Sequence, residues 1–361
     1  RPLSALRASL FESSRVLKSL AGASRALAEL NGRASSIPNE KILISTLALR
    51  EAKASSAIEN IVTTQDAIYR EQADELLADP AAKEVLRYAS ALRSGYEVVR
   101  RRGVLSTSTV VDIQEQIEPN KPGFRKLPGT SLKDQRDRIV YTPPDPSAIA
   151  ELMSDLTRFM NNADTSPLDP LVRMAVAHHQ FESIHPFYDG NGRTGRILNV
   201  LTLVLHGLLE TPILYLSRPI LATKSQYYSL LQRIRDEDDA PDAWDAWIIY
   251  LLEAVSAAAN AGTKSVLAIA AAMQELKHRM RIEVPKLYSH DLLNNLFTNP
   301  YTRIDFVMRD LEVSRITATK YLDELGRRGF VRKVRAGRSN YYVNDKLVTL
   351  LSETDTPAAK A

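Results

Sequence analysis

The sequence contains no cysteine, and this absence excludes disulfide bonds and thiolate metal sites. Because a chain without cysteine is compatible with a reducing compartment, we expect a cytoplasmic protein. No apolar run reaches the length of a membrane span and no signal peptide is visible, so no membrane partner is expected. A strong excess of one charge is also missing, because the net charge is only +4.

The small positive charge is unevenly distributed along the chain. Residues 286–350 hold 12 Lys or Arg side chains against 7 Asp or Glu, so most of the excess lies near the C-terminus. Within this region, residues 327–338 contain six basic side chains and no acidic one. Such a strip suits phosphate backbones, and the length of 361 residues predicts two or three domains.

Residues 185–196 read HPFYDGNGRTGR and concentrate the polar chemistry of the chain. An apolar stripe at helical spacing follows them, which predicts a glycine-rich loop that opens directly into a helix. The start of a helix carries unpaired N–H groups and attracts phosphate, and glycines let the backbone come close to the anion. The residues of the stripe are Ile197, Val200, Leu201, Val204, Leu205 and Leu208.

The side chains of this stretch suit a nucleotide triphosphate. Arg193 and Arg196 are three residues apart on the first helical turns, so both guanidinium groups can reach one polyphosphate. Asp189 is a hard oxygen ligand for Mg²⁺, and His185 is the group whose ordinary pKa lies near neutrality, as a general base requires.

Two other interpretations are weaker. Residues 190–195 also fit the dinucleotide pattern G-x-G-x-x-G, but that pattern needs a preceding strand, whereas residues 169–184 read as a helix. His178, His179 and Glu182 raise a zinc hypothesis. The spacings H-E-x-x-H and H-x-x-E-H are both absent, which favours structural histidines and leaves zinc as a minor alternative.

The twelve residues match the signature His-x-Phe-x-Asp/Glu-Gly-Asn-Gly-Arg-x-x-Arg of the Fic family. Members of this family are α-helical enzymes that move AMP from ATP to a hydroxyl of a target protein. The resemblance implies that His185 takes the proton from the target hydroxyl and that Phe187 anchors the loop. It also implies that Asp189 holds the Mg²⁺ that bridges the α- and β-phosphates.

The rest of the signature is implied to bind the phosphates. Gly190, Asn191 and Gly192 would form the anion hole, with the Asn191 amide on the α-phosphate. Arg193 would neutralise the β-phosphate and Arg196 the γ-phosphate. The related phosphate-transferring branch carries Lys at the position of Gly192, so glycine favours AMP transfer.

Residues 55–60 read SSAIEN and match the family's inhibitory pattern Ser/Thr-x-x-x-Glu-Gly/Asn. The resemblance implies that Glu59 forms a salt bridge with Arg196 and that Ser55 supports this contact. A carboxylate on Arg196 competes with the γ-phosphate for the same donors, so ATP would bind only in an unproductive pose. We therefore expect a protein that is restrained at rest.

Two further regions take roles from the resemblance. Residues Gly123–Tyr141 predict a β-hairpin flap that docks the target protein over the active site by adding a strand. Tyr228 is implied to form a wall of the adenine pocket, and Arg235 falls where several Fic proteins place a small polar residue.

The expected fold is mainly α, a Fic-type helical bundle with the flap hairpin and a C-terminal winged helix-turn-helix domain. The expected ranges are an N-terminal helical region over 1–101 with an inhibitory helix over about 40–69, a catalytic domain over 102–261, a linker helix over 262–284, a winged helix over 285–350 and a disordered tail over 351–361. The third helix of the winged domain would present Arg315, Thr317, Thr319 and Lys320 to DNA or to a protein partner.

The leading functional hypothesis is a protein adenylyltransferase that uses ATP and Mg²⁺ and modifies a Ser, Thr or Tyr hydroxyl of a target or of itself. One alternative is the reverse reaction, in which Glu59 orients a water that removes AMP. The other is a DNA-binding regulator whose Fic domain only senses nucleotide. A homodimer is a further hypothesis.

Overall fold

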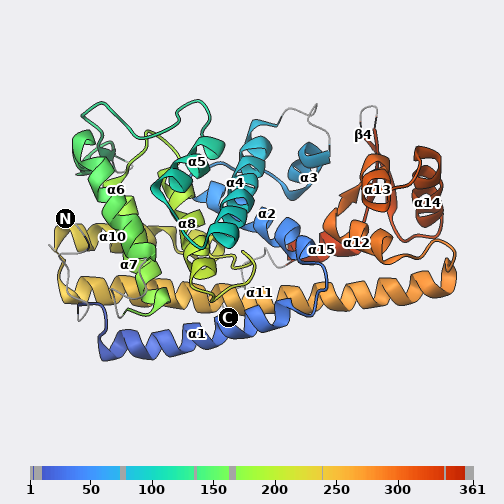
Figure 1. Cartoon of the computed structure of the whole chain (residues 1–361), viewed down its shortest axis with the longest axis horizontal. Coiled ribbons are helices and arrows are strands. Elements are labelled where there is room, and N and C mark those ends of the chain that lie inside the picture. The colour runs from blue at the N-terminus through green and yellow to red at the C-terminus, as the bar shows by residue number, and fades with distance from the viewer. Residues whose placement is uncertain are drawn as a thin grey trace.

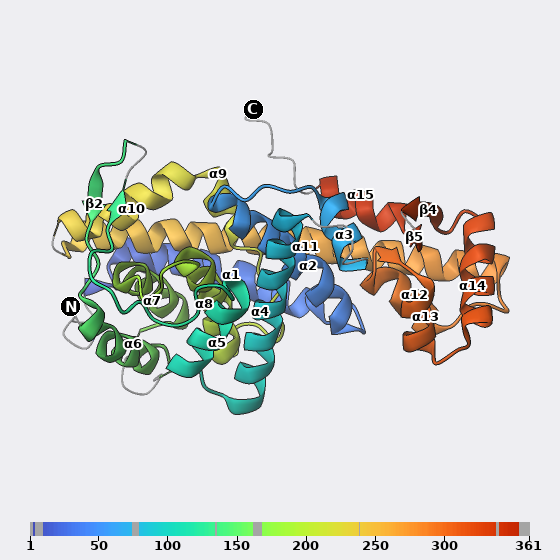
Figure 2. The same cartoon turned by 90° about the horizontal axis from the view of Figure 1, so that it is seen from above.

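The computed structural model describes residues 3, 10–73, 79–133, 136–161, 168–237, 239–336 and 339–353. The fold is mainly helical with a few short strands, as predicted (Figure 1). A bundle of helices forms the larger part and a smaller C-terminal domain lies at its end (Figure 2). The helices of the bundle are α1 (Ser14–Ala34), α2 (Glu40–Ile58), α3 (Gln65–Ala73), α4 (Pro80–Arg102), α5 (Thr107–Ile117), α6 (Pro146–Asn161), α7 (Pro170–Ile184), α8 (Asn191–Leu205), α9 (Ser217–Ala222), α10 (Lys224–Asp236) and α11 (Pro241–Glu283).

The buried stripe predicted after the glycine-rich loop forms α8, which lies at the centre of the bundle. The side chains of Ile197, Val200 and Leu201 are fully buried. Helices α4, α5 and α7 pack around α8, so the N-terminus of α8 is held between rigid neighbours. This packing fixes the direction in which the helix presents its first N–H groups.

The helix expected over residues 40–69 is shorter, because α2 ends at Ile58. Asn60 adopts a left-handed conformation with φ 65°. The N–H of Ile61 bonds the carbonyl of Ser56, and the N–H of Asn60 bonds that of Ala57, both at 3.0 Å. These two bonds form a Schellman motif, which asparagine tolerates better than most residues. Glu59 therefore stands at the very end of α2.

The linker helix expected over 262–284 is not a separate element, because α11 continues without a break from Pro241 to Glu283. Gly262 allows α11 to approach α1 closely, since a Cβ atom at this position would lie 3.0 Å from a methyl group of Leu30. Figure 1 shows α11 running beneath both the bundle and the C-terminal domain. The glycine therefore marks a helix contact and not a domain boundary.

The predicted flap forms a short antiparallel hairpin of β1 (Leu132–Lys133) and β2 (Ile139–Tyr141). Its first strand begins later than Gly123. Phe124, near the start of the predicted hairpin, forms an isolated bridge with Phe187 of the catalytic loop instead. The flap is therefore joined to the active-site loop through its leading segment.

Among the described residues, the C-terminal domain contains four helices and a three-stranded sheet in the order β3-β5-β4, and such a combination of helices and a small sheet is what the winged helix-turn-helix prediction requires. Tyr301 stacks on Tyr69 with ring centroids 5.3 Å apart, and Ser45 donates to the carbonyl of Thr298 at 2.9 Å. The domain therefore packs against α2 and α3. Its elements are α12 (His290–Thr298), β3 (Tyr301–Thr302), α13 (Ile304–Leu311), α14 (Arg315–Arg327), β4 (Arg332–Ala336), β5 (Ser339–Val343) and α15 (Asp345–Glu353).

A disordered tail was expected from Leu351, but residues 351–353 are the last turn of α15, and residues 354–361 lie outside the described range. Several side chains of the basic strip form ion pairs within the domain. Arg327 and Arg328 pair with Glu324, Arg332 with Asp345, and Lys333 with Asp323. Within the described ranges, no helix is long and apolar enough to cross a membrane.

Candidate active site

The catalytic loop leaves α7 at His185, whose backbone is left-handed with φ 47°. The buried side chain of Arg125 holds this turn, since its Nε donates to the carbonyl of His185 at 2.9 Å. The backbone N–H of Arg125 also donates to the carbonyl of Pro186 at 2.9 Å. Nothing in the sequence around Arg125 indicates this role, and its partners lie about 60 residues further along the chain.

Asn191 closes the loop with two reciprocal bonds to Phe187. Its Oδ1 accepts from the Phe187 N–H and its Nδ2 donates to the Phe187 carbonyl, each at 2.9 Å. Phe187 is fully buried, as expected for an anchor. The side-chain amide of Asn191 is thus engaged with the loop through Oδ1 and one of the two N–H donors of Nδ2, and its backbone N–H lies at the start of α8.

The backbone at the start of α8 forms the expected anion site. Gly190 is the N-cap with φ 78°, a left-handed conformation that favours glycine. The first i to i−4 bond of the helix joins the Thr194 N–H to the Gly190 carbonyl, so the N–H groups of Asn191, Gly192 and Arg193 precede the hydrogen-bond ladder. These groups and the helix dipole favour a phosphate at this point.

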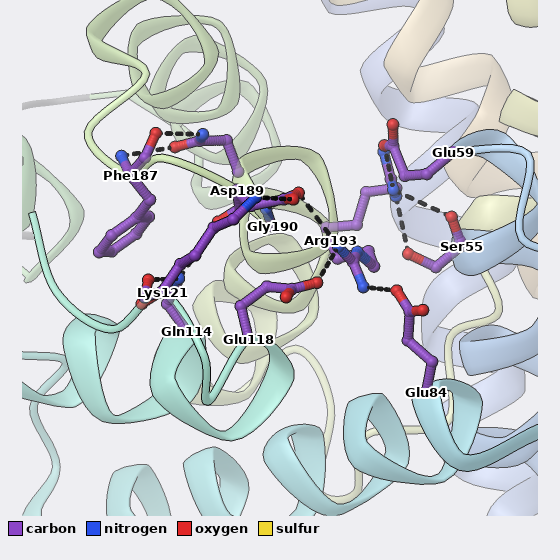
Figure 3. A network of polar contacts seen from close by, with 12 residues as sticks. Ser55, Glu59, Glu84, Gln114, Glu118, Lys121, Phe187, Asp189, Gly190 and Arg193 are labelled. Carbon is purple, nitrogen blue, oxygen red and sulfur yellow. Dashed lines mark hydrogen bonds and ion pairs between the residues drawn. The ribbon is translucent and has the colours of Figure 1, made fainter. Parts of the chain in front are cut away.

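Arg196 and Glu59 form the ion pair that the resemblance implies, and Figure 3 shows Glu59 and Ser55 beside each other at this point. The Nη2 of Arg196 lies 2.8 Å from Oε1 of Glu59 and 3.0 Å from the carbonyl of Ser55, and its Nε donates to Ser55 Oγ at 2.8 Å. The Arg196 side chain is only 1% exposed. Burial opposes the charge of Arg196, but the ion pair outweighs this effect and raises its pKa.

Gly192 is required by this closed arrangement. A Cβ atom at position 192 would overlap with Oε1 of Glu59 and would lie 3.0 Å from Nη1 of Arg196. Any larger residue therefore pushes the inhibitory carboxylate away from Arg196. The absence of a side chain at this position permits the ion pair as well as the close approach of a phosphate.

Arg193 has partners that the sequence did not indicate. Its Nη1 bonds Glu84 of α4, and its Nη2 lies 2.6 Å from Glu118, just after α5, and 3.4 Å from Asp189. The other oxygen of Asp189 lies 3.2 Å from Nζ of Lys121. Figure 3 shows these side chains gathered around the N-terminus of α8. Asp189 is 46% exposed, so its carboxylate can be reached from solvent.

The donor set fits Mg²⁺ that arrives with a nucleotide. Asp189 supplies one carboxylate beside a cavity of about 480 Å³, and the phosphates would supply the remaining oxygens. Among the described residues, no three His, Cys, Asp or Glu side chains are arranged to hold a metal ion by themselves. His178, considered above as a zinc ligand, instead hydrogen-bonds to Tyr227 Oη through Nε2 at 2.8 Å.

A second cavity of about 700 Å³ lies beside the first and is large enough for a nucleoside. Tyr228 lines it and is 43% exposed, while its neighbour Tyr227 is buried. The Arg235 guanidinium lies 4.1 Å from the ring centre of Tyr141 on the flap, and its Nε donates to Ser183 Oγ at 3.1 Å. The base pocket and the flap are therefore connected through Arg235.

The two cavities meet at three residues. Glu59, His185 and Gly192 line both of them. The carboxylate of Glu59 thus stands between the space that fits a nucleoside and the space beside Asp189 and Arg193. A nucleotide that filled both spaces would pass directly by His185.

The pKa values of two buried groups near this point are strongly shifted. Burial, with the nearby charges of Arg235 and Arg125, lowers the pKa of His185 to about 4. Burial raises the pKa of Glu182 to about 7, although Arg196 acts in the opposite direction. His185 is therefore neutral at physiological pH, which is the form that accepts a proton.

We expect the protein to lose stability steeply below pH 6.5. Burial lowers the pKa of His178 and His179 to about 3, and His185 is shifted in the same direction. Only the unfolded chain therefore binds these three protons as the pH falls from 6.5 toward 4, and this favours unfolding. Glu182 opposes the trend, because its raised pKa makes the folded state bind a proton first.

The net expectation is a free energy of unfolding that is lower by roughly 2 to 4 kcal/mol at pH 5 than at pH 7. Urea unfolding at the two pH values measures it. The variant His179→Phe should lose clearly less stability on acidification than the parent protein. His278→Gln, at an exposed position on α11, should behave like the parent. Equal stability at pH 7 and pH 5 would contradict the expectation.

Comparison with known proteins supports the assignment of the fold. A family model described as Fic/DOC family N-terminal matches residues 17–97, and one described as Fic/DOC family matches residues 104–203. A third, described as protein adenylyltransferase SoFic-like, C-terminal domain, matches residues 272–347. Together these models cover more than half of the sequence, and the chain belongs to the Fic/DOC family.

Individual relatives agree with this membership. The chain is 35% identical over 91 residues to the protein adenylyltransferase fic-1 of Caenorhabditis briggsae, and 35% identical over 101 residues to the protein adenylyltransferase Fic of Drosophila melanogaster. These matches cover 25% and 28% of this chain, but they span only 17% and 19% of the two relatives.

Two solved structures share the fold. A Fic family protein from Desulfovibrio desulfuricans G20 matches with a TM-score of 0.55 at 19% identity, over 92% of this chain and 96% of that one. Residues 134–508 of Fic-1 from Caenorhabditis elegans match with a TM-score of 0.52 at 20% identity, over 72% of this chain and 73% of that one. The likeness to the first structure therefore extends over nearly the whole chain.

Proposed function

We propose that this protein is an adenylyltransferase that moves AMP from ATP to a hydroxyl of a protein and that Glu59 restrains it. The observation that carries the proposal is the meeting of the two cavities at His185, directly before the N-terminus of α8. The names of the relatives, which are protein adenylyltransferases, support ATP as the nucleotide.

The proposed reaction is an in-line displacement at the α-phosphorus. The hydroxyl oxygen of a Ser, Thr or Tyr side chain forms a bond to this phosphorus while the bond to the bridging oxygen of the β-phosphate breaks and pyrophosphate leaves. The neutral imidazole of His185 takes the hydroxyl proton. The N–H groups at the start of α8 stabilise the negative charge on the phosphoryl oxygens. Bound Mg²⁺ would neutralise part of the phosphate charge.

The flap gives the proposal a place for the target. Leu132, Lys133 and Val140 of the hairpin line the cavity that also contains His185. An extended segment that pairs with β2 would therefore pass near the proposed base. Ile139 and Val140 are exposed at 62% and 41%, so apolar contacts are available to such a segment.

Transfer of label tests the proposal. The protein is incubated with MgCl₂ and ATP labelled at the α-phosphate, alone and with a cell lysate, and the products are separated under denaturing conditions. We expect label on protein from α-labelled ATP and none from γ-labelled ATP, which separates AMP transfer from phosphate transfer. If the protein binds ATP but neither the parent protein nor the variant Glu59→Gly transfers label, the removal of AMP from a modified protein becomes the function to test.

A further inference from the structure

Arg193 is the most heavily paired cation of the site. Its side chain is only 4% exposed, and both terminal nitrogens of its guanidinium already bond carboxylates. Nη1 bonds Glu84 and Nη2 lies 2.6 Å from Glu118, with Asp189 at 3.4 Å (Figure 3). A phosphate that approaches the terminal nitrogens of Arg193 therefore meets donors that already bond carboxylates, whereas the buried Nε has no hydrogen-bond partner among the described residues.

The charges around Arg193 do not favour an anion. Three carboxylates bond one guanidinium, and the other cation bonded to this group is Lys121, which lies 3.2 Å from Asp189. Glu84 and Glu118 are only 22% and 18% exposed, so water screens them weakly. The three carboxylates outnumber the two cations bonded to them, although the nearby charge of Arg87 acts on Glu118 in the opposite sense, so a phosphate that binds Arg193 has to displace a carboxylate from it.

Glu84 and Glu118 come from different parts of the fold than Glu59. Glu84 lies on α4 and Glu118 follows α5, whereas Glu59 ends α2 and bonds Arg196. Neither acid belongs to the loop of residues 185–196. Each arginine at the start of α8 is thus held by carboxylates from different helices.

We propose that Glu84 and Glu118 form a second restraint on nucleotide binding, which acts on the β-phosphate position through Arg193 and uses carboxylates other than Glu59. The assignment of Arg193 to the β-phosphate rests on the function proposed above. On binding, a β-phosphate oxygen replaces a carboxylate on the guanidinium. The restraint weakens the affinity for any nucleotide that carries a β-phosphate.

Mg²⁺-ADP isolates this restraint, because ADP has a β-phosphate and no γ-phosphate. Its affinity therefore reports on Arg193 with little contribution from the γ-phosphate position at Arg196. AMP, which has no β-phosphate, provides the negative control. Binding is measured by calorimetry on the full chain and needs no transfer activity.

The variants Glu84→Gln and Glu118→Gln each remove one charge and keep the shape of the side chain. We expect each to strengthen the binding of Mg²⁺-ADP about tenfold, because charge-assisted pairs to the same donor compete directly. AMP affinity should stay within about twofold. Glu97→Gln on α4 and Glu115→Gln on α5 are matched controls, since both acids are exposed on the same helices. The controls should bind ADP like the parent protein, and thermal unfolding checks that all variants fold.

Weaker ADP binding by Glu84→Gln and Glu118→Gln would overturn the proposal, because the two acids would then orient Arg193 for the phosphate. Unchanged ADP affinity would overturn it as well. If label transfer occurs but ADP affinity is unchanged, only the second restraint fails. If the variants bind ADP more tightly but no variant transfers label, the restraint stands and the proposed function fails.

Discussion

Replacing His185 by alanine should lower the transfer of AMP at least a hundredfold while ATP still binds. A positioned general base contributes about 10²- to 10⁴-fold to a proton transfer of this kind. The phosphate ligands at the start of α8 remain in place, because the backbone of residue 185 can keep its bonds to Phe181 and Arg125. Transfer from α-labelled ATP measures the rate and calorimetry measures the binding.

The control for this experiment is His278→Ala, which removes an exposed imidazole from α11 and should leave transfer unchanged. Both substitutions are made in the Glu59→Gly variant, whose expected transfer rate is high enough for a hundredfold loss to be measured. If His185→Ala transfers label as fast as its background, His185 is not the base. If the His185→Ala variant no longer binds ATP, the loss of label transfer reflects lost binding and not a lost proton acceptor. The calorimetric measurement of ATP binding distinguishes these two causes.

The sequence alone predicted the part of the site whose residues are neighbours along the chain. Residues 185–208 combine a loop composition with a helical period, and both features appear as the loop and α8. The pair of Glu59 and Arg196 is 137 residues apart, and only the resemblance to the Fic pattern brought the two together. From the residues alone, the stretch around Ser55 reads as an ordinary helix.

Other parts of the site could not be predicted, because they depend on contacts between distant helices. Glu84 is 109 residues from Arg193, and an acid on an amphipathic helix most often faces solvent. Arg125 lies in a loop without a periodic pattern, yet it is buried and holds His185. In the same way, a boundary was expected at residue 262, whereas α11 passes through Gly262 without a break and packs closely against α1 there.

Replacing Glu59 by glycine should raise the transfer of AMP by tenfold or more. The change removes the carboxylate that pairs with Arg196, so that one N–H of Nη2 and the adjacent space beside Gly192 become available, while the bond from Nη2 to the Ser55 carbonyl remains. A γ-phosphate can then bond Arg196, which aligns the α-phosphate with His185. Glycine is tolerated at this position, because residue 59 is the C-cap of α2 and lies outside the regular helix.

The same change should lower the free energy of unfolding by about 1 to 2 kcal/mol, because Arg196 is buried and loses its partner while Ser55 still bonds it. Activation combined with lower stability distinguishes a restraint from a catalytic group. Glu59→Gln keeps the size of the side chain and removes its charge, so its transfer rate should lie between those of the parent and Glu59→Gly. If Glu59 instead orients water for the removal of AMP, both variants will lose that hydrolysis. A Glu59→Gly variant that is no faster than the parent would show that the ion pair with Arg196 does not limit transfer.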